Sequence, residues 1–234
     1  MKCLIIVAHP DDEAIIAGGF IAKAQADFKV YFATKNEQGR GLKVTQEEKV
    51  KSTIKEAEKS GKLGNFSPEF LGFEDATLAD HKSELLKNII SIIHKNKPDI
   101  IITHHKDDNH IDHRTLAEIV PEASQQSCCG TFGFKGLSKK PLVICANINL
   151  EGKFDLGNIV VALKKEHLEK KIKMISCYAD LASNHNSEGA RIEDLIRARA
   201  VIAGAVINET YGEAYTILSF PLDQGILKNI SKII

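Results

Sequence analysis

The sequence predicts an α/β fold built on an open, mostly parallel sheet with helices on both faces. Short apolar runs recur along the chain, for example at residues 3–8 and 99–103. Patterns of helical periodicity separate these runs, and this alternation is typical of βαβ units in a parallel sheet. The first run stops at Pro10, which cannot continue a sheet ladder. Without repeats or a linker-like stretch, residues 1–234 are expected to form one Rossmann-like domain.

The expected elements follow in order from the first strand. Further strands are expected at residues 29–34, 69–73, 99–103, 142–149 and 214–220. Helices are expected at residues 14–26, 45–61, 83–97, 116–123, 160–178 and 188–207. Thr45 and Glu48 suit a capping box at the start of the second helix, and Pro98 ends the third. Pro121 predicts that the fourth helix is short, with an irregular loop over residues 124–140.

Composition narrows the class of protein. The 234 residues carry no formal net charge, which argues against nucleic acid as a partner. No apolar run approaches the roughly 20 residues of a membrane span. The first residues lack the apolar region and cleavage site of a secretory signal. The five cysteines are an odd number without a C-x-x-C pair, which predicts free thiols in a reducing cytoplasm.

Two segments are far richer in metal-binding side chains than their surroundings. One is His-Pro-Asp-Asp-Glu at residues 9–13, and the other spans residues 103–114, with histidines at 104, 105, 110 and 113. Each segment follows a predicted buried strand. Ligands and catalytic groups gather at the carboxyl ends of strands in open α/β sheets, so the two segments can meet at one rim.

Imidazole and carboxylate at this rim predict a catalytic zinc site. Such a site keeps one position for water beside three protein ligands. His9 and Asp12 can bind from one turn, and a histidine of the second segment can complete the set. A carboxylate that is not a ligand must act as general base, and Asp11 is the natural candidate. Asp112 can orient a nearby histidine.

The two motifs resemble those of the LmbE-like (PIG-L) de-N-acetylase family. They stand here as Ala-His-Pro-Asp-Asp-Glu at residues 8–13 and His-Ile-Asp-His at residues 110–113. The resemblance implies one Zn²⁺ per chain bound by His9, Asp12 and His113, with another divalent metal as the alternative. It implies Asp11 as the general base, and His110 paired with Asp112 as an auxiliary acid or polarising group.

The resemblance also extends to the segments 98–104, 168–178 and 211–215. The chain departs from the family at Ser52, Ala203 and Asp180-Leu181, none of which touches the implied zinc ligands. The implied activity is hydrolysis of the N-acetyl group from an N-acetylglucosamine-type sugar conjugate, releasing acetate and a free amine. Association into trimers or hexamers occurs among relatives, so the resemblance leaves a homo-oligomer of either kind open.

Other polar residues are expected to contact the substrate or to support the proposed ligands. The loops 36–41, 75–80 and 124–140 are expected to contact the sugar. Arg114 suits either an acidic aglycone or a structural contact on its helix. Strand alternation lets only one of His104 and His105 face the rim, and both are expected to support the ligands. His185 falls in a polar loop and is expected to be solvated.

Rival functions remain open. Acid pairs after a first strand also build magnesium pockets for phosphoryl transfer or receiver-like domains, although such pockets use oxygen ligands rather than imidazole. A non-catalytic zinc- or sugar-binding protein would have no need of Asp11. A dinucleotide-binding site is not expected, because no G-x-G-x-x-G follows the first strand.

Overall fold

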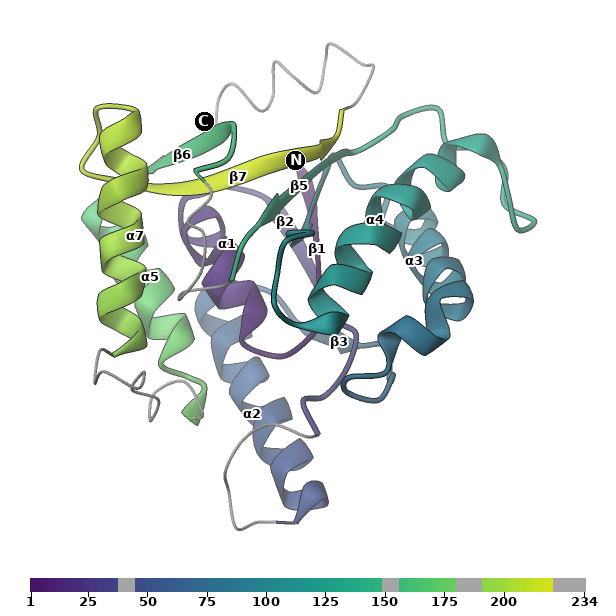
Figure 1. The fold of residues 1–234 in the computed structure, drawn as a ribbon, viewed down its shortest axis with the longest axis horizontal. Coiled ribbons are helices and arrows are strands. Elements are labelled where there is room, and N and C mark those ends of the chain that lie inside the picture. The colour runs from purple at the N-terminus through teal and green to yellow at the C-terminus, as the bar shows by residue number, and fades with distance from the viewer. Residues whose placement is uncertain (38–44, 149–155, 180–190, 221–234) are drawn as a thin grey trace.

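The computed structural model describes residues 1–37, 45–148, 156–179 and 191–220. The strands of these segments form one seven-stranded sheet in the order β3-β2-β1-β4-β5-β7-β6 (Figure 1). They are β1 (Lys2–Val7), β2 (Asp27–Phe32), β3 (Pro68–Phe70), β4 (Ile100–His104), β5 (Leu142–Ala146), β6 (Ile159–Leu163) and β7 (Tyr211–Ser219). The predicted α/β fold with a mostly parallel sheet is confirmed.

The order of the strands creates a switch point beside β1. β1 pairs in parallel with β2 on one side and with β4 on the other, so the chain winds outward in both directions from the centre of the sheet. β2 with β3 and β4 with β5 are also parallel, whereas β7 runs antiparallel to both β5 and β6. A crevice outside the carboxyl ends of β1 and β4 is where such a sheet places its ligands.

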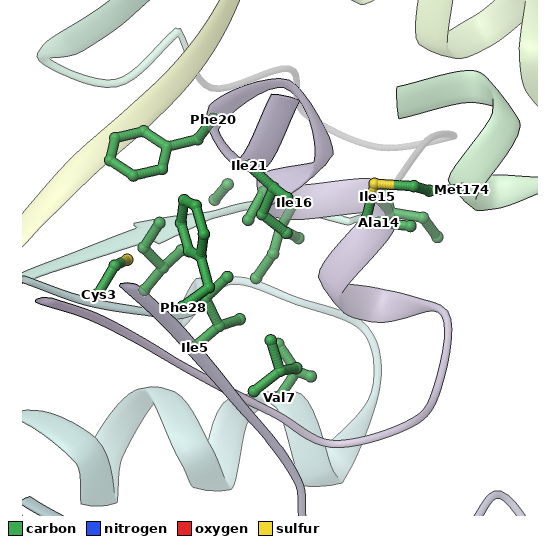
Figure 2. Packing of buried hydrophobic residues seen from close by; sticks show 14 of the residues in the cluster. Cys3, Ile5, Val7, Ala14, Ile15, Ile16, Phe20, Ile21, Phe28 and Met174 are labelled. Atoms are coloured by element: carbon green, nitrogen blue, oxygen red, sulfur yellow. The ribbon is translucent and has the colours of Figure 1, made fainter. Parts of the chain in front are cut away.

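Helices cover both faces of the sheet (Figure 1). They are α1 (Asp12–Lys23), α2 (Gln46–Gly64), α3 (Lys82–Asn96), α4 (Ile111–Cys129), α5 (Lys165–Ile175) and α7 (Ile192–Val206), with a short 3-10 turn η1 (Leu78–His81). Successive residues of β1 point to opposite faces. Cys3, Ile5 and Val7 join the core under α1 and α5, shown in Figure 2. Leu4 and Ile6 join the core under α3 and α4.

Two element predictions are wrong. Residues 160–178 were expected to form one helix, but β6 occupies Ile159–Leu163 before α5 begins. The run Ile-Val-Val-Ala-Leu is rich in β-branched residues, and pairing with β7 satisfies its backbone. The fourth helix does not stop near Pro121, because α4 continues to Cys129 and ends at Gly130 in a left-handed conformation. Buried residues on both sides of the proline, including Leu116 and Ala123, pack into the core and outweigh its cost.

No helix among the described segments is long and apolar enough to cross a membrane.

Candidate metal centre and active site

The two motif segments meet at the switch point of the sheet. His9 follows β1 directly, His104 ends β4, and His110 and His113 lie at the start of α4. Asp75 joins them from the loop between β3 and η1, and its carboxylate contacts the His9 ring. The side chains that the sequence placed at one rim therefore converge, and most of them are buried.

Three donor atoms form a compact triangle at the centre of the cluster. Nδ1 of His9 and Nε2 of His113 are 3.1 Å apart, and each lies 3.4 Å from Oδ2 of Asp12. Donor atoms bound to zinc at about 2.0–2.1 Å in a tetrahedral site are roughly 3.3–3.4 Å from one another. The chemistry and spacing of these donors therefore fit a zinc ion. Overlapping groups that include His104, His110, Asp75 and Asp112 are also close enough to contribute to a metal site.

Each of the two central histidines has a second carboxylate on its far nitrogen. Nε2 of His9 lies 2.8 Å from Oδ1 of Asp75, and Nδ1 of His113 lies 2.9 Å from Oδ1 of Asp108. A carboxylate in this position keeps the proton on the far nitrogen and leaves the near nitrogen free to bind a metal. Both rings are thus held with their near nitrogens, Nδ1 of His9 and Nε2 of His113, directed into the triangle.

The carboxylates raise the pKa of the central histidines. Burial opposes protonation of His113, but Asp12 and Asp108 outweigh it and raise its pKa to about 9. Burial likewise opposes protonation of His9, and Asp112, Asp12 and Asp75 raise its pKa well above the usual value. Burial works against ionisation of Asp12, yet the neighbouring His113 and His104 hold its pKa well below the usual range. This negative pocket is suited to a cation.

Asp11 adopts an unusual backbone conformation at the N-cap of α1. Its φ is 125° and its ψ is −33°, and its side chain makes no capping hydrogen bond to the helix. Burial and the adjacent charge of Asp12 raise the pKa of its carboxyl well above the usual value. A carboxylate next to the triangle of donor atoms and not engaged in capping is placed to accept a proton from a group bound there.

His110 caps α4 with its own ring. Nδ1 accepts the backbone N–H of Asp112 at 3.2 Å, and the ring is only half-buried. The His110 and His9 rings pack nearly perpendicular to each other, with the ring centres 4.6 Å apart. The Nε2 atom is therefore the one available to a substrate.

The Asp112 carboxylate has partners other than the predicted one. It accepts the backbone N–H groups of Ala76 at 2.8 Å and Leu78 at 3.1 Å, and it lies 3.4 Å from Nε2 of His9. Asp112 does contact His110, as expected, but it does so through its backbone N–H group and not through its carboxylate. The carboxylate therefore anchors the loop that carries Asp75.

His104 and His105 point in different directions, as strand alternation predicts. The His104 ring stacks on His113 with 4.0 Å between ring centres. Its Nε2 accepts the backbone N–H of Ala8 at 2.9 Å, so the lone pair on that nitrogen is already used. Burial lowers the pKa of His104 to about 4, which keeps it neutral. His105 instead accepts the backbone N–H of Asp107 through Nδ1.

The remaining predicted residues lie at the edge of the site or beyond it. Arg114 is exposed, and its Nη1 donates to the carbonyl oxygens of Asp108 and Asn109, which favours the structural interpretation of this side chain. His185, the Asp180-Leu181 departure and positions 38–41 of the first loop lie outside the described residues. The first part of the segment 124–140 belongs to α4.

Sequence reasoning did not assign the roles of Asp75 and Asp108. Asp75 was placed in a sugar-contacting loop, yet its carboxylate lies on a ring nitrogen of His9. Asp108 lies within the second motif segment, but only the fold shows that it contacts His113. The rule that a metal-binding histidine needs a carboxylate on its other nitrogen would have prompted a search for both.

Comparison with known proteins identifies the family of this chain. A family model described as "PIG-L: GlcNAc-PI de-N-acetylase" matches residues 4–124, which include both motifs and more than half of the chain. The chain belongs to this family. The family predicted from the two motifs is confirmed, and with it the class of enzyme, a deacetylase that hydrolyses an amide bond. The sequence matches none of the curated proteins.

Solved structures share the fold at low sequence identity. N,N'-diacetylchitobiose deacetylase from Pyrococcus horikoshii is 22% identical with a TM-score of 0.79, covering 93% of this chain and 83% of that one. The zinc-inhibited form of teicoplanin deacetylase Orf2 is 15% identical with a TM-score of 0.74, and the match covers 93% of this chain and 97% of that one. GalB, the 4-carboxy-2-hydroxymuconate hydratase from Pseudomonas putida KT2440, is 17% identical with a TM-score of 0.75, covering 95% and 98%.

Proposed function

We propose that this deacetylase is a zinc-dependent hydrolase that removes the N-acetyl group from an N-acetylglucosamine-type sugar conjugate. The products are acetate and the free amine of the sugar. His9, Asp12 and His113 are the proposed ligands of one Zn²⁺ per chain, Asp11 is the proposed general base, and His110 is the proposed auxiliary acid.

The observation that carries the proposal is the triangle of Nδ1 of His9, Oδ2 of Asp12 and Nε2 of His113. Its edges of 3.1–3.4 Å match those of a tetrahedral zinc site. Two nitrogen donors favour zinc over magnesium, which prefers oxygen ligands. Three protein ligands leave the fourth position for chemistry, as in catalytic zinc sites.

The residues around the triangle fit amide hydrolysis. Zinc, when bound, would polarise the acetamide carbonyl and lower the pKa of a water molecule. Asp11 accepts the proton of the water that attacks the carbonyl carbon. His110, through Nε2, donates to the oxygen that becomes negative in the tetrahedral species. The proton held by Asp11 then passes to the leaving nitrogen as the C–N bond breaks, so that acetic acid and the neutral amine leave, and the acid then gives up its proton to solvent and becomes acetate.

The choice of an N-acetylated amino sugar rests on the family and its fold relatives. The family description names GlcNAc-PI, and the Pyrococcus relative is described as a diacetylchitobiose deacetylase. The loops 36–41, 75–80 and 124–140 are the proposed sugar contacts. Within the second loop, the backbone N–H groups of Ala76 and Leu78 donate to the Asp112 carboxylate, which lies 3.4 Å from Nε2 of His9.

One experiment separates this proposal from its rivals. Zinc content and amine release from a panel of N-acetylglucosamine conjugates are measured for the wild type and for Asp11→Asn. We expect both proteins to bind one zinc, and the variant to release amine at least about a hundredfold more slowly. Asn is a matched change because it preserves size and, like Asp, tolerates a positive φ.

Other outcomes favour other functions. If neither protein binds zinc but both bind magnesium, the ligand set is wrong and phosphoryl transfer becomes the better hypothesis. Zinc binding without turnover on any conjugate would favour a zinc- or sugar-binding protein. Equal rates in the wild type and Asp11→Asn would remove Asp11 from the mechanism.

Two expectations accompany the proposal. A reducing cytoplasm suits the five cysteines, all of which are free thiols. Self-association as a trimer or hexamer is tested by sedimentation velocity on the purified chain, where a single species of monomer mass would contradict it.

A further inference from the structure

The backbone of Asp11 must be held in place by its surroundings. Its φ of 125° lies in a region that residues with a side chain rarely adopt. Such a conformation persists only where neighbouring groups impose it. The carbonyl oxygen of Asp11 already starts α1 by accepting the N–H groups of Ala14 and Ile15. Its N–H group is the other point at which the residue can be held.

Glu13 holds that N–H group. Oε2 of Glu13 accepts the backbone N–H of Asp11 at 3.1 Å. The other oxygen, Oε1, accepts the hydroxyls of Ser60 at 2.6 Å and Tyr178 at 2.7 Å. Glu13 is 0% exposed, so its carboxylate depends on these three donors for solvation.

The two hydroxyls come from distant parts of the chain. Ser60 belongs to α2, and Tyr178 follows α5. The contact between Glu13 and Tyr178 spans 165 residues of sequence. The carboxylate is therefore clamped between three elements, and its position cannot change without disturbing their packing. Such a clamp gives Asp11 a rigid support on elements outside its own loop.

A second buried carboxylate offers a comparison. Glu213 accepts the N–H groups of Gly19 and Phe20, the ammonium of Lys171 and the hydroxyl of Tyr215. The Glu213 carboxylate has as many hydrogen-bond donors as the Glu13 carboxylate or more, but its backbone partners lie in the second half of α1, away from Asp11. Glu13 differs because its backbone partner is the proposed general base itself.

We propose that Glu13, held by Ser60 and Tyr178, is a positioning residue for Asp11 that fixes the backbone of the base and so aims its carboxylate. The inference rests on the proposed function, in which Asp11 accepts the proton of the attacking water. Displacing a catalytic group by about 1 Å costs up to about a hundredfold in rate, so the clamp matters for turnover even though it does not touch the substrate.

The test compares two tyrosines. Tyr178→Phe removes a hydroxyl from Glu13, and the control Tyr215→Phe removes one from Glu213; both tyrosines are buried in the same core. We expect kcat to fall about tenfold in Tyr178→Phe, with KM and zinc content unchanged. In Tyr215→Phe, kcat stays within about twofold even where the loss of stability is similar.

A second pair of variants tests the hydrogen bond between the Asp11 N–H group and the Glu13 side chain. The amide oxygen of Glu13→Gln can accept the Asp11 N–H while its NH₂ donates to the two hydroxyl oxygens. Glu13→Leu has a similar size and can accept nothing. We therefore expect Gln to keep kcat within about threefold of the wild type, and Leu to lose about a hundredfold. Equal losses in both would overturn the proposal.

A readout independent of turnover completes the design. Hydrogen exchange of the Asp11 amide, followed by NMR in the zinc-loaded protein, reports its bond to Glu13. We expect exchange about tenfold faster in Tyr178→Phe and Glu13→Leu, and unchanged in Tyr215→Phe. Equal behaviour of the two tyrosine variants in exchange and in kcat would overturn the positioning role. If the wild type hydrolyses no conjugate, the proposed function fails, and the exchange data still decide whether Glu13 holds Asp11.

Discussion

The Nε2 atom of His9 lies 2.8 Å from Oδ1 of Asp75, a residue 66 positions further along the chain. This contact holds the His9 ring so that Nδ1 faces Asp12 and His113. It also keeps the proton on Nε2, since a carboxylate stabilises an N–H donor in that position. Asp75 therefore orients the ring of His9, a proposed metal ligand.

Loss of the Asp75 carboxylate should weaken metal binding. In Asp75→Ala, the His9 ring loses its acceptor and can rotate or change tautomer. We expect the zinc affinity to fall about 10- to 100-fold, as is usual when the partner of a ligand histidine is removed. Competition titration with a chromogenic chelator measures the affinity.

Asp80→Ala is the control for this change. Asp80 lies close by in the same part of the chain and is exposed. Its removal should leave the zinc affinity within about twofold of the wild type. Equal affinities in Asp75→Ala and the wild type would show that Asp75 does not orient the ligand.

Zinc binding should release protons. In the metal-free protein the neighbouring carboxylates raise the pKa of His113 to about 9 and the pKa of His9 above its usual value, but Nδ1 of His9 and Nε2 of His113 are 3.1 Å apart, so only one of these two nitrogens carries a proton. Zinc requires neutral imidazole, so binding should displace the proton between these two nitrogens, about one proton at pH 7. The apparent affinity should therefore increase as the pH rises toward 9, and the increase should level off above it.

Calorimetry in buffers of different ionisation enthalpy counts these protons. The observed binding enthalpy should vary linearly with the ionisation enthalpy of the buffer, with a slope equal to the number of protons released. A slope of zero at pH 7 would mean that both histidines are already neutral in the metal-free protein.

The fold was largely predictable because its signals are local. Buried apolar runs and helical patterns marked β1 and β4, and their alternation was enough to indicate a parallel sheet. The errors arose where tertiary contacts decide the structure. β6 forms by pairing with β7, and α4 passes through Pro121 because the core lies on both sides of it. Neither effect is visible in a short window of sequence.

The site likewise has residues that the sequence predicts and residues that only the fold reveals. Two dense motifs made His9, Asp12 and His113 recognisable as candidate ligands, because each motif is continuous in sequence. Asp75 sits alone in an ordinary loop, and only the fold brings it to His9. Tyr178 is likewise unremarkable in sequence, yet its hydroxyl reaches Glu13. Groups that support a site depend on distant contacts, which a single sequence does not reveal.

Gly204 should not tolerate a side chain. A Cβ at this position of α7 would lie 2.6 Å from the carbonyl oxygen of Glu209 and 2.7 Å from backbone atoms of Tyr211. Alanine usually stabilises a helix by up to about 1 kcal/mol relative to glycine. Here we expect Gly204→Ala to lower the free energy of unfolding by about 1–3 kcal/mol, because backbone atoms must move. Urea denaturation measures the change.

The control for Gly204 is an exposed helical position. Ser91 lies on α3 and is exposed, so Ser91→Ala should change the stability by no more than about 0.5 kcal/mol. A gain of stability in Gly204→Ala would mean that the turn between α7 and β7 relaxes without cost.

His110 has two roles that can be separated by substitution. Its ring caps α4 through Nδ1, and its Nε2 is the proposed donor to the developing oxyanion. Asparagine is a good N-cap but has no imidazole, whereas alanine has neither property. We expect His110→Asn to keep the stability of the wild type within about 0.5 kcal/mol and His110→Ala to lose about 1 kcal/mol.

Both His110 variants should lose activity to a similar extent. Removal of one oxyanion donor costs about 10²- to 10³-fold in kcat, and neither Asn nor Ala can restore a donor at the position of Nε2. Amine release at saturating substrate, with zinc content measured in parallel, checks this. If the activity instead followed stability, so that His110→Asn were as active as the wild type, His110 would be a helix cap alone and the oxyanion would require another donor.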